Sequence, residues 1–189
     1  MLWQSICRRL LHDRMGWTVR LTQPIPEKCV ICVAPHTSNW DFVIGELYYG
    51  SLGRKANFLM KREWFFPPLG TLLRRIGGIP VSRGKRTSLT DQLAEHALRS
   101  DRFCLAVTPE GTRSKVTKWK RGFYYIALKA GLPILLFGID YAKREIVCTR
   151  TLTPSGDAET DMREIMSYYA GFKGKHPEKF AVEEATQAN

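Results

Sequence analysis

The chain has 189 residues and a mass of 21.6 kDa, which is the size of one globular domain. Hydrophobic residues make up 44% of it and charged residues 25%, so a disordered, collagen-like or coiled-coil chain is excluded. The 29 Lys and Arg residues outnumber the 18 Asp and Glu residues, and the net charge of +11 predicts an anionic partner. Nucleic acid, phospholipid headgroups and phosphorylated small molecules all fit that description.

Most of the positive charge lies in two segments. Residues 54–86 contain nine cations and a single acid, Glu63, and residues 113–129 contain six cations and no acid. We therefore expect the anionic partner to bind at these two segments.

The five cysteines, an odd number, do not form the framework of a disulfide-rich protein, and they favour a reducing compartment. Cys29 and Cys32 lie within 28–34, an apolar run whose β-branched residues predict a strand. Because strand residues three apart face opposite sides, the two sulfurs would not converge on a metal ion. Both are therefore predicted to be buried core residues.

Residues 1–16 predict an amphipathic helix. Apolar residues recur there at helical spacing, with Arg8, Arg9, His12 and Asp13 between them. Such a helix suits the interface of a membrane, but it would equally pack on its own domain. No run in the sequence approaches the roughly 18 to 20 apolar residues that a membrane-spanning helix needs, so none is predicted.

Strand and helix patterns alternate along residues 17–175. Strands are expected at 28–34, 56–60, 78–82, 103–107, 132–139 and 145–148, and helices at 39–49, 67–75, 87–99, 123–130 and 157–170. This alternation predicts a single α/β domain with a largely parallel or mixed sheet flanked by helices, and catalytic residues on the loops beyond the strand ends. Residues 176–189 are polar and are expected to form a C-terminal tail.

A histidine and an aspartate follow the first of these strands. In Pro35-His-Thr-Ser-Asn-Trp-Asp41, the carboxylate of Asp41 is placed to orient the imidazole of His36 and raise its basicity. Ser38 and Asp41 also have the spacing of a helix capping box, which needs no chemistry. Capping alone leaves His36 without a role, so both interpretations stay open.

Two further polar segments follow strands. The loop Thr108-Pro-Glu-Gly-Thr-Arg-Ser114 suits a polyol phosphate, with a plain polar turn as the alternative. Its candidate groups are the Glu110 carboxylate, the Gly111 backbone, the Thr112 hydroxyl and the Arg113 guanidinium. Arg83, after the strand at 78–82, is either surface charge or a second contact to the same phosphate.

Together these segments resemble the motif blocks of the glycerolipid acyltransferases related to 1-acylglycerol-3-phosphate acyltransferase. The blocks occur in the order typical of that family and cover roughly residues 28–140. They are His36-Thr-Ser-Asn-Trp-Asp41, Gly78-Ile-Pro-Val-Ser-Arg83, Pro109-Glu-Gly-Thr-Arg-Ser114 and Leu132-Pro-Ile-Leu135.

The resemblance implies a glycerol-3-phosphate acyltransferase-like fold. It also implies transfer of a fatty acyl group from acyl-CoA or acyl carrier protein to a hydroxyl of a lysophospholipid or glycerol-phosphate-like acceptor. His36 would be the general base and Asp41 its orienting partner. The implied contacts to the acceptor's phosphate and glycerol are Arg83, Glu110, Gly111, Thr112 and Arg113. The reaction needs no cofactor, metal ion or nucleophilic cysteine.

Peripheral or monotopic attachment to the cytoplasmic side of a membrane is expected as well. Cations interspersed with aromatic residues predict a surface for anionic lipid that needs no spanning helix. Its members would be Arg54, Lys55, Lys61, Arg62, Arg74, Arg75, Lys118, Lys120 and Arg121, together with Trp64, Phe65, Phe66 and Trp119.

Two other functions stay open. A basic nucleic-acid-binding domain would use 118–121 and 123–125, where cations adjoin aromatic residues. It gives His36 and Asp41 no role, so nucleic acid is not an expected partner. The other alternative is an acyltransferase-like protein that binds lipid without turnover. For an active enzyme, a lysolipid with an amino-acid headgroup also stays open as acceptor.

Overall fold

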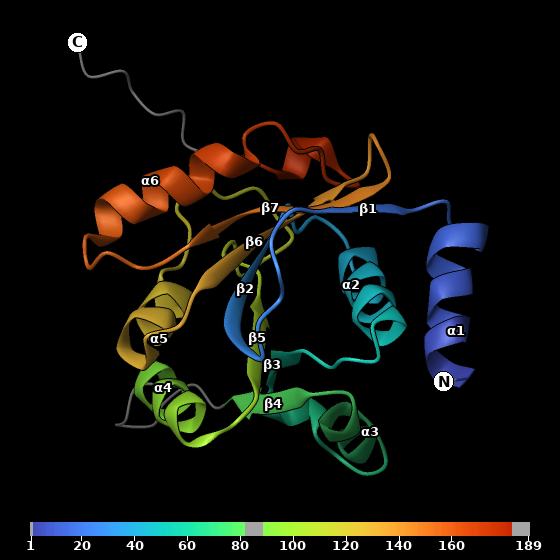
Figure 1. Ribbon diagram of the computed structural model, residues 1–189, viewed down its shortest axis with the longest axis horizontal. Helices are drawn as coiled ribbons and strands as arrows, with labels where there is room; N and C mark the ends of the chain where they lie inside the picture. Colours follow the sequence, from blue (N-terminus) through green and yellow to red (C-terminus); the bar gives the residue numbers. More distant parts are fainter. Residues whose placement is uncertain (1, 82–88, 183–189) are drawn as a thin grey trace.

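The fold is built on one sheet of seven strands. The computed structural model describes residues 2–81 and 89–182, and the strand order within them is β1-β7-β6-β2-β5-β3-β4 (Figure 1). The strands are β1 (Thr18–Leu21), β2 (Lys28–Ala34), β3 (Asn57–Lys61), β4 (Gly78–Val81), β5 (Phe103–Val107), β6 (Ile134–Asp140) and β7 (Glu145–Leu152). Neighbouring strands run parallel except β6 and β7, which are antiparallel. The predicted α/β fold with a largely parallel or mixed sheet is confirmed.

Helices cover both faces of this sheet. They are α1 (Leu2–Arg8), α2 (Trp40–Ser51), α3 (Leu69–Arg75), α4 (Leu89–Arg99), α5 (Gly122–Ala130) and α6 (Ala158–Tyr169). A π-helical turn, η1 (Arg9–Arg14), continues α1, and two 3₁₀ turns, η2 (Arg62–Trp64) and η3 (Pro177–Lys179), lie in loops. Figure 1 shows α1 and α2 on one side of the sheet and α4, α5 and α6 on the other.

β2 is apolar on both faces because it lies at the centre of the sheet. Val30 and Cys32 belong to the core formed with α4, α5 and α6, whereas Cys29 and Ile31 belong to the core formed with α2. Cys29 and Cys32 therefore face opposite sides, as predicted. All five cysteines are buried and free.

Most predicted elements lie within two residues of their observed ends. β7 is the exception, because it continues four residues beyond the predicted strand, to Leu152. β1 was not predicted: it is short, three of its four residues are exposed, and it pairs only with β7 at the edge of the sheet. Residue 82, the predicted end of β4, and residues 87–88, the predicted start of α4, lie outside the described residues.

The N-terminal helix packs on the domain and also presents apolar side chains to solvent. α1 and η1 lie against α2, and Cys7 and Leu11 are fully buried. A Cβ at Gly50 of α2 would lie 2.7 Å from the Cys7 sulfur, so glycine lets the two helices approach. Leu2 and Trp3 stay exposed, at 78% and 65%. Packing on the domain is therefore observed, and the exposed face is compatible with a membrane interface.

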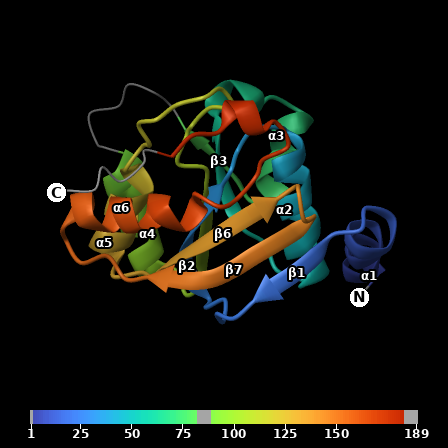
Figure 2. The same cartoon turned by 90° about the horizontal axis from the view of Figure 1, so that it is seen from above.

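The C-terminal segment packs on the domain as far as it is described. Residues 171–182 continue beyond α6 and include η3 (Figure 2). The backbone N–H of Tyr141 donates to the carbonyl of Lys173 at 2.9 Å. The ring of Phe180 lies 6.1 Å from that of Trp119, measured between centroids. The predicted polar tail is thus packed up to residue 182.

Candidate active site

Three parallel strands bring the candidate residues to one edge of the sheet. β2 lies between β5 and β6 and runs parallel to both, so the loops that follow these strands meet beyond their carboxyl ends. His36 follows β2, residues 110–113 follow β5, and Tyr141 follows β6. Every predicted site residue that the structure describes lies in this region, and Arg83 is outside the described residues.

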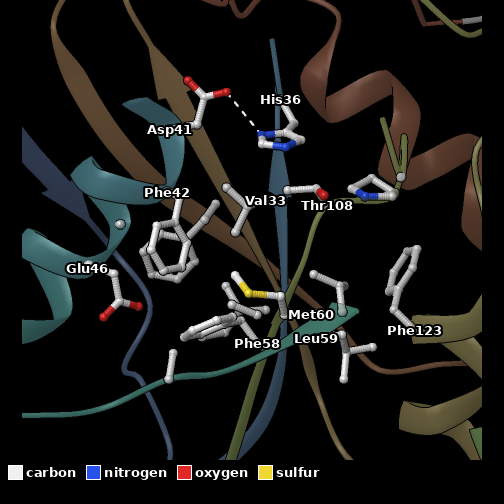
Figure 3. A pocket seen from close by; sticks show the side chains of 18 of the residues that line it. Val33, His36, Asp41, Phe42, Glu46, Phe58, Leu59, Met60, Thr108 and Phe123 are labelled. Atoms are coloured by element: carbon white, nitrogen blue, oxygen red, sulfur yellow. Dashed lines mark hydrogen bonds and ion pairs between the residues drawn. The ribbon is translucent and has the colours of Figure 1, made fainter. Parts of the chain in front are cut away.

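His36 and Asp41 form a hydrogen-bonded pair (Figure 3). Nδ1 of His36 lies 3.1 Å from Oδ2 of Asp41, in the first turn of α2. A carboxylate can only accept, so Nδ1 is the donor in this pair, and in the neutral imidazole Nε2 then has the free lone pair. The imidazole is 19% exposed and the carboxylate only 2%. The geometry therefore presents Nε2 as a base held in place by a buried anion.

Capping interactions coexist with this pair. Oδ2 of Asp41 also accepts from the backbone N–H groups of Thr37 (2.8 Å) and Ser38 (2.9 Å), while the Ser38 hydroxyl accepts from the Trp40 N–H (3.2 Å). Asn39 occupies the N-cap position, one residue later than the predicted capping box, and its side chain makes no cap bond. One carboxylate thus holds both the start of α2 and the imidazole.

Tyr141, which no sequence motif predicted, extends the network. Its hydroxyl donates to Oδ1 of Asp41 at 2.7 Å, and its ring packs edge-on against Trp17 with 5.0 Å between centroids. Burial and this hydrogen bond raise the pKa of Tyr141, so the hydroxyl keeps its proton. The adjacency of β6 and β2 is the signal that could have found it, because the residue that follows β6 comes near the one that follows β2.

Glu110 holds the backbone of the base. Its Oε1 accepts from the N–H of His36 at 2.8 Å, and the side chain is 5% exposed. Burial raises the pKa of Glu110 from about 4.5 to about 7. Its Oε2 is buried and has no hydrogen-bond partner in the described part of the chain. This placement favours a positioning role over the predicted contact with the acceptor's glycerol.

The rest of the loop after β5 borders an apolar cavity. Gly111 has a φ of +64°, in the left-handed region that favours glycine. Arg113 is exposed and donates from its guanidinium to the side-chain oxygen of Asn39. Thr112 lies between them and borders the same space.

An apolar cavity of about 1430 Å³ opens beside the pair (Figure 3). His36 and Asp41 border it, and its apolar lining includes Val33, Phe42, Phe58, Leu59, Met60 and Phe123. A carboxyl group, Glu46, reaches the same space, and burial raises its pKa to about 7. Such a cavity suits a long apolar chain whose reacting end lies at His36.

The arrangement is suited to taking a proton from a hydroxyl group. The base and its orienting carboxylate border a space that a substrate can enter. Across residues 2–81 and 89–182, no group of three or more His, Cys, Asp or Glu residues could hold a metal ion.

Replacing the Glu110 carboxyl is expected to change how stability depends on pH. Between about pH 4.5 and 7 the folded chain keeps a proton on Glu110 that the unfolded chain has released, so the free energy of unfolding falls as the pH rises through this window. Glu110→Gln should remove this decline, of about 3 kcal/mol, from urea unfolding measured across the window. The exposed Glu63→Gln is the control. Identical pH dependence in wild type and Glu110→Gln would contradict the prediction.

Comparisons with known proteins identify the family of the chain. An acyltransferase family profile matches residues 16–139, about two thirds of the chain. A 1-acyl-sn-glycerol-3-phosphate acyltransferase of Pseudomonas aeruginosa is 29% identical over 126 residues, which cover 63% of this chain and 47% of that protein, so the chain spans about half its relative's length. The fold resembles that of the 1-acyl-sn-glycerophosphate acyltransferase PlsC of Thermotoga maritima, with a TM-score of 0.57 and 18% identity over 92% of this chain and 80% of that one. The chain belongs to the acyltransferase family, as its motifs predicted.

Proposed function

We propose that this chain transfers a fatty acyl group from a thioester to a hydroxyl of a lysophospholipid or glycerol-phosphate-like acceptor, in phospholipid synthesis. The observation that carries the proposal is the His36–Asp41 pair on the border of an apolar cavity. Family membership supports the reaction type, and the two relatives are named as acyltransferases of 1-acylglycerol phosphate.

His36 acts as the general base in this reaction. Nε2 takes the proton of the acceptor hydroxyl as its oxygen attacks the thioester carbonyl, and the tetrahedral intermediate expels the thiolate of coenzyme A or acyl carrier protein. The imidazolium then returns the proton to the thiolate. Because the acceptor oxygen attacks the thioester directly, no acyl-enzyme forms. Asp41 stabilises the imidazolium, and proton transfer of this kind contributes about 10² to 10⁴ in rate.

The apolar cavity holds the acyl chain in this mechanism. Each methylene removed from water is worth about 0.8 kcal/mol, so a cavity with apolar walls favours a long aliphatic chain. Because His36 borders the cavity, a chain lying in it presents its thioester carbonyl near Nε2. The base and the electrophile are then brought together by burial of the chain.

An anionic membrane surface is the proposed site of action. Leu2 and Trp3 of α1 are exposed beside Arg8 and Arg9, a combination suited to a lipid interface. Trp64 is likewise 53% exposed, next to Arg62 on η2. In the described part of the chain, no helix has both the length and the apolar character to cross a bilayer.

Part of the predicted basic and aromatic surface is not free. Trp119 is buried against Tyr169, so it does not belong to the lipid surface predicted from the sequence. Arg121 forms a two-pronged ion pair with Glu159, at 2.6 and 2.9 Å. Phe123 is buried as well. The nucleic-acid alternative loses support, because aromatic side chains that it needs for base stacking lie in the core.

Removing the imidazole should abolish acyl transfer. His36→Ala is expected to lower kcat at least about 100-fold while the protein stays folded, because the proton acceptor is lost. The assay measures transfer from acyl-CoA and from acyl carrier protein to a panel of lysolipids, with circular dichroism as the check on folding. His96→Ala, on the exposed side of α4, is the control and should retain activity. Undiminished transfer by His36→Ala would show that His36 is not the general base.

Loss of the Tyr141 hydroxyl should slow catalysis without altering substrate binding. Tyr141→Phe removes a donor from Asp41, and we expect kcat to fall about tenfold with the acceptor KM unchanged. The acid limb of the pH profile of kcat/KM should move to higher pH, because the carboxylate holds the imidazolium more strongly. Tyr125→Phe, on the surface of α5, serves as the control. A changed KM with an unmoved pH profile would assign Tyr141 a purely structural role.

Filling the cavity from α2 should shorten the acyl chain that the enzyme accepts. Gly45 lines the cavity, and a Cβ on it would meet nothing within 4 Å, so a larger side chain fits the helix and occupies the space. For Gly45→Leu, kcat/KM with long acyl donors should fall roughly fourfold for each methylene displaced, with short donors unaffected. Gly45→Ala makes the same helix change with little volume. An unchanged chain-length profile in Gly45→Leu would show that the acyl chain lies elsewhere.

A further inference from the structure

The segment after α6 closes over the loop that carries the catalytic pair. Lys173 accepts a backbone hydrogen bond from Tyr141 (2.9 Å), and the N–H of His176 donates to the Thr37 hydroxyl (3.1 Å). Gly174 is buried there, and a Cβ on it would lie 2.7 Å from the Thr37 hydroxyl oxygen, so the close approach depends on glycine. This segment is outside the part of the chain that matches the acyltransferase family.

A polar pocket of about 400 Å³ lies between this segment and two active-site loops. His176 and Lys179 line it from the segment, and Arg113 lines it from the loop after β5. Hydroxyl and amide side chains complete the lining: Thr37, Ser38, Asn39, Thr112 and Ser114. No carboxylate of the described residues lines this pocket, but Oε1 of Glu178, which is 68% exposed, lies 3.9 Å from Nδ1 of His176.

The lining selects an oxyanion. Two cations with no facing carboxylate attract negative charge, and hydroxyl groups and an imidazole add further donors. A phosphate monoester has the charge and the acceptor oxygens to use them. A carboxylate-lined pocket would instead favour a cation, so the sign of the charge decides the class of ligand.

The place of the pocket decides which phosphate it receives. Thr37 and Ser38 directly follow the base, and Asn39, Thr112 and Arg113 border both this pocket and the apolar cavity. An acceptor whose hydroxyl lies at His36 carries its phosphate only a few bonds away. In acyl-CoA or acyl carrier protein the phosphate is separated from the thioester by the whole pantetheine arm.

We propose that His176 and Lys179 bind the phosphate of the acyl acceptor together with Arg113. This inference rests on the proposed function, and it adds binding residues from outside the family motifs. The C-terminal segment is then part of the acceptor site, and its backbone contacts to Tyr141 and Thr37 set the position of these side chains.

Steady-state kinetics with 1-acylglycerol 3-phosphate tests the proposal. Lys179→Gln and His176→Ala should each raise the KM for this acceptor roughly three- to tenfold, with kcat and the KM for acyl-CoA within about twofold of wild type. Lys179→Arg keeps the charge and should restore the KM. With uncharged monoacylglycerol as acceptor, Lys179→Gln should have no effect.

Lys173→Gln is the matched control, because it removes the same charge from the same segment at a residue that does not line the pocket. The KM for the acceptor should stay at the wild-type value. An equal effect of Lys173→Gln and Lys179→Gln would overturn the proposal in favour of a general positive field. A rise in the KM for acyl-CoA alone would overturn it in favour of the donor's phosphate.

Titration calorimetry with glycerol 3-phosphate tests the pocket without turnover. Lys179→Gln should weaken binding to the intact chain by a similar factor, and Lys173→Gln should not. Such a result supports the pocket even where the chain shows no acyl transfer, so failure of the proposed function is distinguishable. Unchanged binding by Lys179→Gln in a chain that does transfer acyl groups would overturn this inference alone.

Discussion

A buried carboxylate at the start of α2 holds the active site together. Asp41 is 3% exposed and accepts hydrogen bonds from the imidazole of His36, the backbone of Thr37 and Ser38, and the hydroxyl of Tyr141. A carboxylate this deeply buried is tolerated only where such donors replace the water it has lost. The end of β2, the first turn of α2 and the residue after β6 are therefore fixed as one unit, and the imidazole of His36 is fixed with them.

His36 is constrained at its backbone as well as at its ring. Asp41 holds the ring from α2, and Glu110 holds the amide from the loop after β5. The two carboxyl groups come from different elements, so the protein alone holds His36 in place before any substrate binds. The hydrogen bond to the His36 amide places Glu110 in a buried position, and burial raises the pKa of Glu110 to about 7. The imidazole is thus preorganised. Burial of the Glu110 carboxyl group lowers the stability of the fold, and the surrounding core must offset that loss.

The elements and the His36–Asp41 pair could be predicted because both depend on neighbouring residues. The apolar run of β2 and the spacing of His36 and Asp41 lie within short stretches of sequence. Tyr141 contacts Asp41 across 100 residues and His176 contacts Thr37 across 139, and no local pattern carries such contacts. The polar composition of the C-terminal segment favours a tail, and only its backbone hydrogen bonds show that it packs against the loops after β2 and β6.

The proposed site combines residues from two separate parts of the chain. His36, Asp41 and Glu110 belong to the stretch that matches the family, whereas residues 171–182 follow the last strand of the sheet in the sequence. They meet the active-site loop through backbone atoms and glycine, so their exposed side chains are free to change without disturbing His36. In the proposed acceptor site, substitutions of these side chains can therefore alter the binding of the phosphate while the hydrogen bonds that hold His36 stay in place.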